Sequence, residues 1–148
     1  MAFMHRRKLI RAIDAGRIEA AIQAAEKNTS GEIRVSISFF FWGKVRPAAE
    51  KAFRRLGMTA TKERNGILFF IVPSRRRFVV LGDEGIHAEV GQDFWDHLTA
   101  VMAVEFKKGR FEEGLLKGIA EAGSRLGVHF PYDRATDKNE LPDKIDIT

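Results

Sequence analysis

The chain contains no cysteine and no long apolar run. Without cysteine it cannot form disulfide bonds, thiolate zinc sites or a cysteine nucleophile, and this composition is typical of a reducing compartment. No segment reaches the ~18 apolar residues that cross a bilayer. The basic N-terminus also lacks the apolar stretch of a signal peptide, because Arg11 and Asp14 interrupt it. We therefore predict a cytoplasmic protein without a transmembrane segment.

What the chain does contain is an ordinary globular composition with a modest excess of positive charge. Its 148 residues, of which 45% are hydrophobic, fit one domain. We place that domain at residues 1–130 and a polar, partly docked tail at 131–148. The net charge of +5 raises the question of nucleic acid, but the basic residues are divided between the N-terminus and the turn Arg75–Arg77. We interpret them as solvated spots, which does not favour a nucleic-acid partner.

The apolar pattern predicts an α/β fold with the order α-β-α-β-β-α-α. Residues 32–39 alternate between apolar and polar side chains, as in a strand with one buried face. Residues 67–72 are continuously apolar, which is typical of a strand buried on both faces. Residues 77–81 follow a short turn and form a hairpin with that strand. Helical spacing of apolar residues predicts helices at 5–28, 47–56, 93–108 and 111–126.

The order of these elements predicts which polar residues meet. The first two strands are joined through a helix and should be parallel, whereas the hairpin makes the third strand antiparallel to both. The starts of the first two strands therefore lie at the same edge of the sheet as the end of the third. The polar residues expected at that edge are Ser30, Glu32, Arg64, Asn65, Asp83 and Glu84, with Asp93 nearby at the start of the next helix.

The segment Gly82-Asp83-Glu84-Gly85 is the centre of this edge. Carboxylate and amide oxygens suit hard divalent cations such as calcium or magnesium. Gly82 and Gly85 would let the backbone turn sharply and would supply carbonyl oxygens. The alternative is structural, with Asp83 and Glu84 only capping a turn or the next helix.

Several segments resemble the TPM domain family, which includes thylakoid-lumen proteins tied to photosystem II repair and many bacterial proteins. The matching segments are Thr29–Val35, Arg64–Leu68, Gly82–Ile86, Asp93–Trp95, Phe106–Phe111, Gly114-Leu115 and Gly118-Ile119. Their order and spacing extend over roughly residues 17–131. The resemblance implies a three-layer α/β/α sandwich around a small mixed sheet. It also implies a divalent cation, calcium above all, bound by loops at one end of the sheet.

The resemblance also implies particular site residues and an activity. Some family members are described as acid phosphatases, so a metal-dependent phosphatase, a hydrolase, is implied here. The predicted metal ligands are Asp83, Glu32, Glu84 and Asp93, and the predicted ligand or phosphate contacts are Arg64, Asn65 and Ser30. The sequence has no P-loop, no Gly-x-Ser-x-Gly and no His-Glu-x-x-His motif, and His87 is interpreted as a surface residue.

The opposite edge of the sheet supports a second hypothesis, because aromatic and basic residues gather there. They are Phe40, Phe41, Trp42, Lys44 and Arg46, and the Arg75–Arg77 turn is expected beside them. Aromatic rings beside arginines can stack on bases or lie in a membrane interface. The alternative is a strand end packed beneath neighbouring helices. On the second hypothesis the protein is a non-catalytic docking module for a protein or a membrane.

Overall fold

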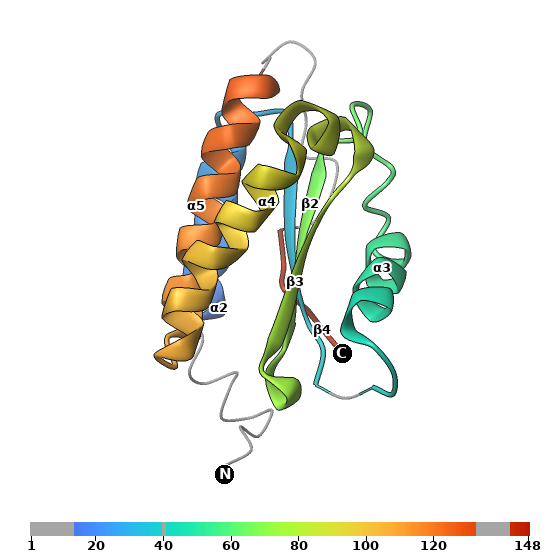
Figure 1. Cartoon of the computed structure of the whole chain (residues 1–148). Coiled ribbons are helices and arrows are strands. Elements are labelled where there is room, and N and C mark those ends of the chain that lie inside the picture. The colour runs from blue at the N-terminus through green and yellow to red at the C-terminus, as the bar shows by residue number, and fades with distance from the viewer. Residues whose placement is uncertain (1–13, 40, 133–142) are drawn as a thin grey trace.

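The protein is a three-layer α/β/α sandwich, as predicted. The computed structural model describes residues 14–39, 41–132 and 143–148. Its strands are β1 (Glu32–Ile37), β2 (Gly66–Val72), β3 (Arg77–Gly82) and β4 (Asp146–Ile147), and its helices are α2 (Ala15–Glu26), α3 (Val45–Arg55), α4 (Glu84–Lys107) and α5 (Phe111–His129). Helices α2, α4 and α5 cover one face of the sheet, and α3 covers the other (Figure 1). No helix in the described ranges is long and apolar enough to cross a bilayer.

The strand order β3-β2-β1-β4 confirms the predicted topology of the first three strands. β1 and β2 are parallel, with Glu32 opposite Gly66 and Ile37 opposite Ile71. β3 returns antiparallel to β2 through a 3₁₀ turn at Pro73–Arg75. The starts of β1 and β2 and the end of β3 therefore meet at one edge of the sheet.

The central strand β2 supplies side chains to both hydrophobic cores. All of its residues are buried, which confirms the prediction from its continuous apolar sequence. Ile67, Phe69 and Ile71 point into the core beneath α2, α4 and α5. Leu68, Phe70 and Val72 point into the core beneath α3. Because successive side chains of β2 point to opposite faces of the sheet, this one strand packs against both helical layers.

The C-terminal segment adds a strand that the sequence did not predict. Asp146 and Ile147 pair with Ser36 and Ile37 of β1 in parallel. The carboxylate of Asp146 accepts hydrogen bonds from Ser36 Oγ at 2.8 Å and from Arg55 Nη2 at 2.8 Å. Burial acts to raise the pKa of Asp146, but these hydrogen bonds outweigh it and hold the pKa below its ordinary value. The end of the predicted polar tail therefore forms a strand, because the edge of β1 is free to pair with it.

The first helix and the helix after β3 differ in extent from their predictions. The predicted helix at residues 5–28 is observed as α2 from Ala15, capped by Asp14, whose Oδ1 accepts from Arg17 N at 3.1 Å. Its earlier part lies outside the described residues, as does Phe40. Helix α4 begins at Glu84 rather than near Asp93, and it is kinked at Gly91, where φ is 73°. The prediction found only the part after the kink, because the glycines before it are typical of a loop.

Candidate functional site

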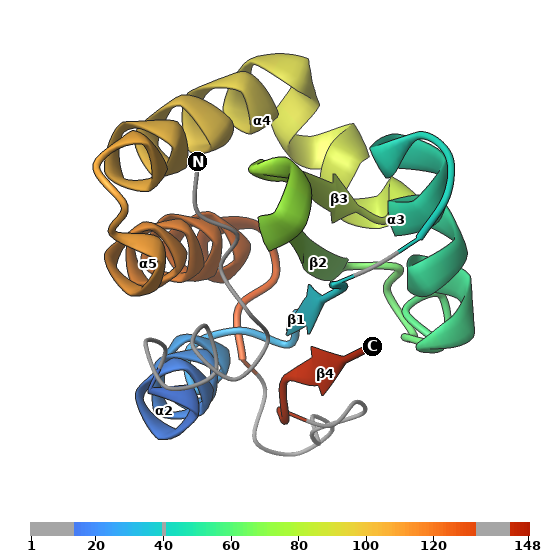
Figure 2. The same cartoon turned by 90° about the horizontal axis from the view of Figure 1, so that it is seen from below.

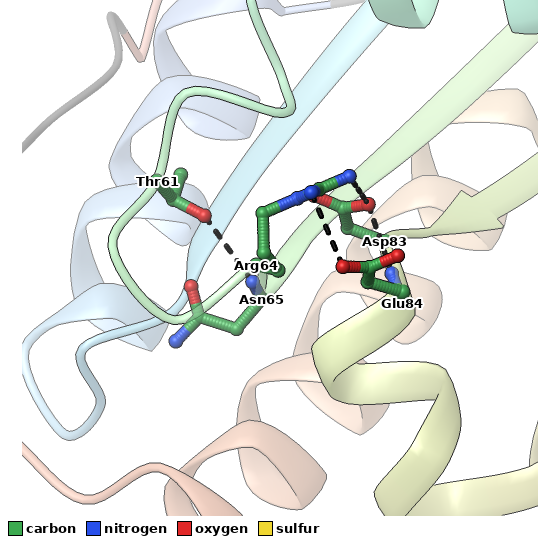
Figure 3. Close-up of polar contacts among 5 residues, drawn as sticks. All are labelled: Thr61, Arg64, Asn65, Asp83 and Glu84. Atoms are coloured by element: carbon green, nitrogen blue, oxygen red, sulfur yellow. Dashed lines mark hydrogen bonds and ion pairs between the residues drawn. The ribbon is translucent and has the colours of Figure 1, made fainter.

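Of the polar residues that the topology places at one edge, Arg64, Asn65, Asp83 and Glu84 lie together there (Figure 3), and Ser30 is hydrogen-bonded to Asn65. We call this group the acidic rim, and its members are Ser30, Glu63, Arg64, Asn65, Asp83 and Glu84. They come from the loop before β1, the loop before β2 and the junction between β3 and α4. Two small clusters make up the rim, one around Arg64 and one around Asn65.

Arg64 lies between two carboxylates. Its Nε donates to Asp83 Oδ2 at 2.6 Å and its Nη2 donates to Asp83 Oδ1 at 2.9 Å. Its Nη1 is 3.2 Å from Glu84 Oε1. Asp83 is buried, whereas the Arg64 side chain is 41% exposed and that of Glu84 is 72% exposed. Hydrogen bonding to Asp83 raises the pKa of Arg64 above its ordinary value, so the guanidinium is a permanent positive charge in the rim.

The backbone holds this ion pair in place. The carbonyl of Arg64 accepts hydrogen bonds from Gly85 N at 2.8 Å and Ile86 N at 3.3 Å, which satisfies N–H groups in the first turn of α4. Arg64 has a left-handed backbone, with φ of 52°. Asp83 caps the same helix by accepting from Glu84 N at 2.8 Å. The structural interpretation of Asp83 as a helix cap is therefore confirmed, and the cap is also the partner of Arg64.

The two glycines of the segment serve close packing rather than a sharp turn, which corrects the sequence prediction. Neither Gly82 nor Gly85 has a positive φ. A Cβ on Gly85 would overlap the carbonyl oxygens of Glu63 and Arg64, and a Cβ on Gly82 would overlap the ring of Trp95. Only glycine therefore lets the loop before β2 lie directly on the first turn of α4.

The second cluster of the rim surrounds the buried amide of Asn65. Its Nδ2 donates to Ser30 Oγ at 3.2 Å and lies 3.4 Å from Glu63 Oε2. Ser30 Oγ donates to Glu63 Oε2 at 2.8 Å, and Asn65 N donates to Thr61 Oγ1 at 3.2 Å. The Oδ1 atom of Asn65 is buried and has no hydrogen-bond partner within the described part of the chain. Glu63 was missed from the sequence, where it is one charged residue of an exposed loop.

Glu32 is buried near a different set of carboxylates. Glu26 accepts a hydrogen bond from Ile33 N at 2.8 Å. Burial, and then a hydrogen bond with Asp143, raise the pKa of Glu26 to about 10, and the nearby charge of Glu32 acts in the same direction. This group was also missed, because Glu26 and Asp143 are distant in sequence and neither stands in a motif.

The remaining predicted residues lie apart from the rim contacts. Asp93 is exposed on α4 beyond the kink at Gly91. Among the described residues it forms no hydrogen bond or ion pair with a rim residue. His87 is exposed, and its Nδ1 accepts from Trp95 Nε1 at 2.9 Å. Within the same ranges, no group of three or more histidines and carboxylates is arranged to hold a metal ion.

The comparisons with known proteins agree with the fold. The sequence profile of the TPM domain matches residues 4–125. The NMR structure of the BA42 protein from the psychrophilic bacterium Bizionia argentinensis is 40% identical, with a TM-score of 0.85, and the match covers 90% of this chain and 92% of that one.

Two more distant similarities are to N-terminal domains of bacterial proteins. The domain from P. gingivalis is 19% identical with a TM-score of 0.62, covering 78% of this chain and 76% of that one. The domain of cg2496 from Corynebacterium glutamicum is 16% identical with a TM-score of 0.59, covering 75% of this chain and 70% of that one. These two show the fold alone, and no curated protein matches. The profile match and the 40% identical structure show that this chain belongs to the TPM domain family.

Proposed function

We propose that the acidic rim binds a divalent cation, calcium or magnesium, in exchange for the guanidinium of Arg64. The observation that carries this proposal is the position of Arg64 between Asp83 and Glu84. The pair of carboxylates already holds a positive group, and that group belongs to a side chain that is 41% exposed. Carboxylate and amide oxygens are the ligands that these hard cations prefer.

The donor set fits a cation only when the Arg64 side chain moves away. Both oxygens of Asp83 are hydrogen-bonded to Arg64 in this structure. Once they are released, Asp83 and Glu84 supply carboxylate oxygens. Glu63 belongs to the same rim, as does Asn65, whose Oδ1 has no hydrogen-bond partner among the residues that the structure describes. The proposal does not include Glu32 or Asp93, which form no contact with Arg64 among the described residues.

Removal of the internal cation should strengthen binding. We expect Arg64→Asn to tighten calcium binding by roughly tenfold, a typical size for a coupling between two competing interactions. Asparagine tolerates the left-handed backbone at this position, so the loop keeps its shape. Isothermal titration calorimetry with calcium and with magnesium measures the effect.

The matched control is Arg55→Gln, which removes a guanidinium paired with Asp146 on another part of the fold. It changes the net charge equally and should leave the affinity unchanged. The proposal is wrong if neither the natural chain nor Arg64→Asn gives heat with either ion. It is also wrong if Arg64→Asn weakens binding, because Arg64 would then be needed to hold the site together.

Asp83→Asn tests the ligand itself. Asparagine is as good a helix cap as aspartate, so α4 should keep its start while the rim loses a charge. We expect calcium binding to disappear, with circular dichroism unchanged. The corresponding control is Asp146→Asn, which removes a carboxylate from the pair with Arg55.

Phosphate-ester hydrolysis makes a further demand on the same residues. It needs a cation for the phosphate and a nucleophile or an activated water. In this structure the guanidinium of Arg64 is directed at Asp83 and Glu84 rather than away from them (Figure 3). Any release of phosphate from p-nitrophenyl phosphate should therefore depend on added calcium or magnesium and vanish in Asp83→Asn. Hydrolysis that persists in this variant would not come from the rim.

A further inference from the structure

The end of the sheet opposite the acidic rim carries a cluster of positive charge. We call it the basic edge, and its members are Trp42, Lys44, Arg46, Arg76 and Arg77. Trp42 and Lys44 precede α3 and Arg46 lies in its first turn, while Arg76 ends the turn between β2 and β3 and Arg77 begins β3. Figure 2 looks onto this end of the molecule, where the turn and the loop before α3 lie at the ends of the strands. The edge belongs to no part of the cation-binding proposal.

Arg75 fastens the two segments into one unit. Its Nη1 donates to the carbonyl of Gly43, and its Nη2 donates to the carbonyl of Phe41 at 2.8 Å. Its guanidinium also lies over the ring of Phe41, 4.6 Å from the centroid. Ser74 Oγ donates to Phe39 O at 3.0 Å. The charge of Arg75 is therefore used inside the protein, and the loop that carries Trp42 is held in a fixed place.

The two aromatic residues at this end of the sheet differ in burial: Phe41 packs against the core, whereas Trp42 is exposed to solvent. Phe41 packs against Phe70, with ring centroids 6.2 Å apart, as the alternative of a packed strand end expects. Trp42 is 89% exposed, the largest exposure among the large hydrophobic residues that the structure describes. Tryptophan is enriched where proteins meet the membrane–water interface.

The four cations of the basic edge are not neutralised by a carboxylate among the residues that the structure describes. Lys44, Arg46, Arg76 and Arg77 form no ion pair within residues 14–39, 41–132 and 143–148. Lys44, Arg46 and Arg77 line a groove of about 690 Å³ that also contains Phe78 and Val79. Their placement is electrostatically costly, because positive charges close to one another repel.

The start of α3 increases this positive potential. Lys44 is at the N-cap position and makes no side-chain cap, and the first turn of α3 contains no acidic residue. The free N–H groups there carry partial positive charge, and cations at this end of a helix are in their unfavourable position. An external anion would reduce the electrostatic repulsion among these side chains and with the start of α3. The partner that complements this surface is therefore negatively charged.

We propose that the basic edge docks on an anionic phospholipid surface, with Trp42 at the interface and the four cations against lipid phosphates. A single exposed ring favours lipid over single-stranded nucleic acid, which needs successive aromatic platforms for its bases. A stable protein interface buries about 800 Å² on each partner. The basic edge consists of five residues around one loop and one turn, which is enough for interfacial contact with a bilayer.

Vesicle sedimentation with the full chain tests the proposal. Vesicles of phosphatidylcholine with about 30 mol % phosphatidylserine should bind the protein, whereas phosphatidylcholine alone should not. The variant Lys44→Gln/Arg46→Gln/Arg77→Gln should lower the partition coefficient on the order of 100-fold, since each basic residue near an anionic surface contributes about fivefold. Trp42→Ser should abolish the blue shift of tryptophan fluorescence on binding, because Trp95 is buried throughout.

The matched control is Lys27→Gln/Lys51→Gln/Arg54→Gln, which removes three exposed charges from other surfaces and should bind nearly as well as the natural chain. Equal loss in both triple variants would overturn the proposal, because net charge alone would then explain binding. Absence of binding to the anionic vesicles would also overturn it. So would a fluorescent single-stranded oligonucleotide that binds more tightly than the vesicles and depends on the same three cations.

Discussion

The two ends of the sheet differ in how they use charge. At the acidic rim, Arg64 is shared between Asp83 and Glu84, and Glu63 accepts a hydrogen bond from Ser30. At the basic edge, the four cations beside Trp42 have no ion-pair partner in the part of the chain that the structure describes. Charge that is paired inside the protein fixes the position of a loop and a helix. Charged side chains without an internal partner do not hold any loop or helix in position, and they remain accessible to solvent or to a binding partner.

We therefore expect substitutions at the acidic rim to lower the stability of the fold much more than substitutions at the basic edge. The largest effect is expected for Gly85→Ala. The added Cβ would overlap the carbonyl oxygens of Glu63 and Arg64, so the loop would have to leave the first turn of α4. We expect a loss of about 3 kcal/mol in the free energy of unfolding, measured by urea denaturation.

Gly16→Ala is the control for this substitution. Gly16 lies in the first turn of α2, where a Cβ would be 3.3 Å from Asp14 Oδ1. Alanine is a better helix former than glycine, so this variant should be neutral or slightly more stable. If Gly85→Ala behaves like Gly16→Ala, the contact between the loop and α4 does not hold the rim together.

A smaller effect is expected from Glu26, whose pKa is raised to about 10 by burial and by its hydrogen bond with Asp143. The unfolded chain releases this proton near the ordinary value of 4.5, whereas the folded protein keeps it until about pH 10. The stability should therefore be greatest below pH 4.5 as far as this group is concerned, and should fall as the pH rises through this window.

Glu26→Gln should remove that dependence. Glutamine can accept the hydrogen bond from Ile33 N and donate one to Asp143 without carrying a charge. We expect the free energy of unfolding at pH 9 to rise and its slope between pH 6 and pH 9 to become flatter. Glu50→Gln, an exposed position on α3, is the control and should not change the slope. An unchanged slope in Glu26→Gln would show that this carboxyl is ionised in the folded protein.

The sequence predicted the sheet well and the site only in part, for physical reasons. The alternating pattern of residues 32–39, the continuous apolar run of residues 67–72 and the crossover and hairpin rules were enough to bring Ser30, Asn65 and Asp83 to one edge. Gly85 was interpreted as a turn residue. Glycine is in fact required there because the residue packs against the carbonyl oxygens of Glu63 and Arg64, a contact that the local sequence does not reveal. Glu63 lacked a signal altogether, and β4 is only two residues long, so its pairing depends on the exposed edge of β1 rather than on its own pattern.

The smallest effect on stability is expected at the basic edge. Lys44→Gln/Arg46→Gln/Arg77→Gln removes three cations that have no ion pair in the described ranges, so the free energy of unfolding should change by less than about 0.5 kcal/mol. Any change should be a gain, because the substitutions relieve repulsion among the cations and with the start of α3. Urea denaturation at low and high salt checks this, since the gain should shrink as salt screens the charges. A loss of more than about 1 kcal/mol would mean that these cations stabilise the fold, and the contrast between the two ends would then disappear.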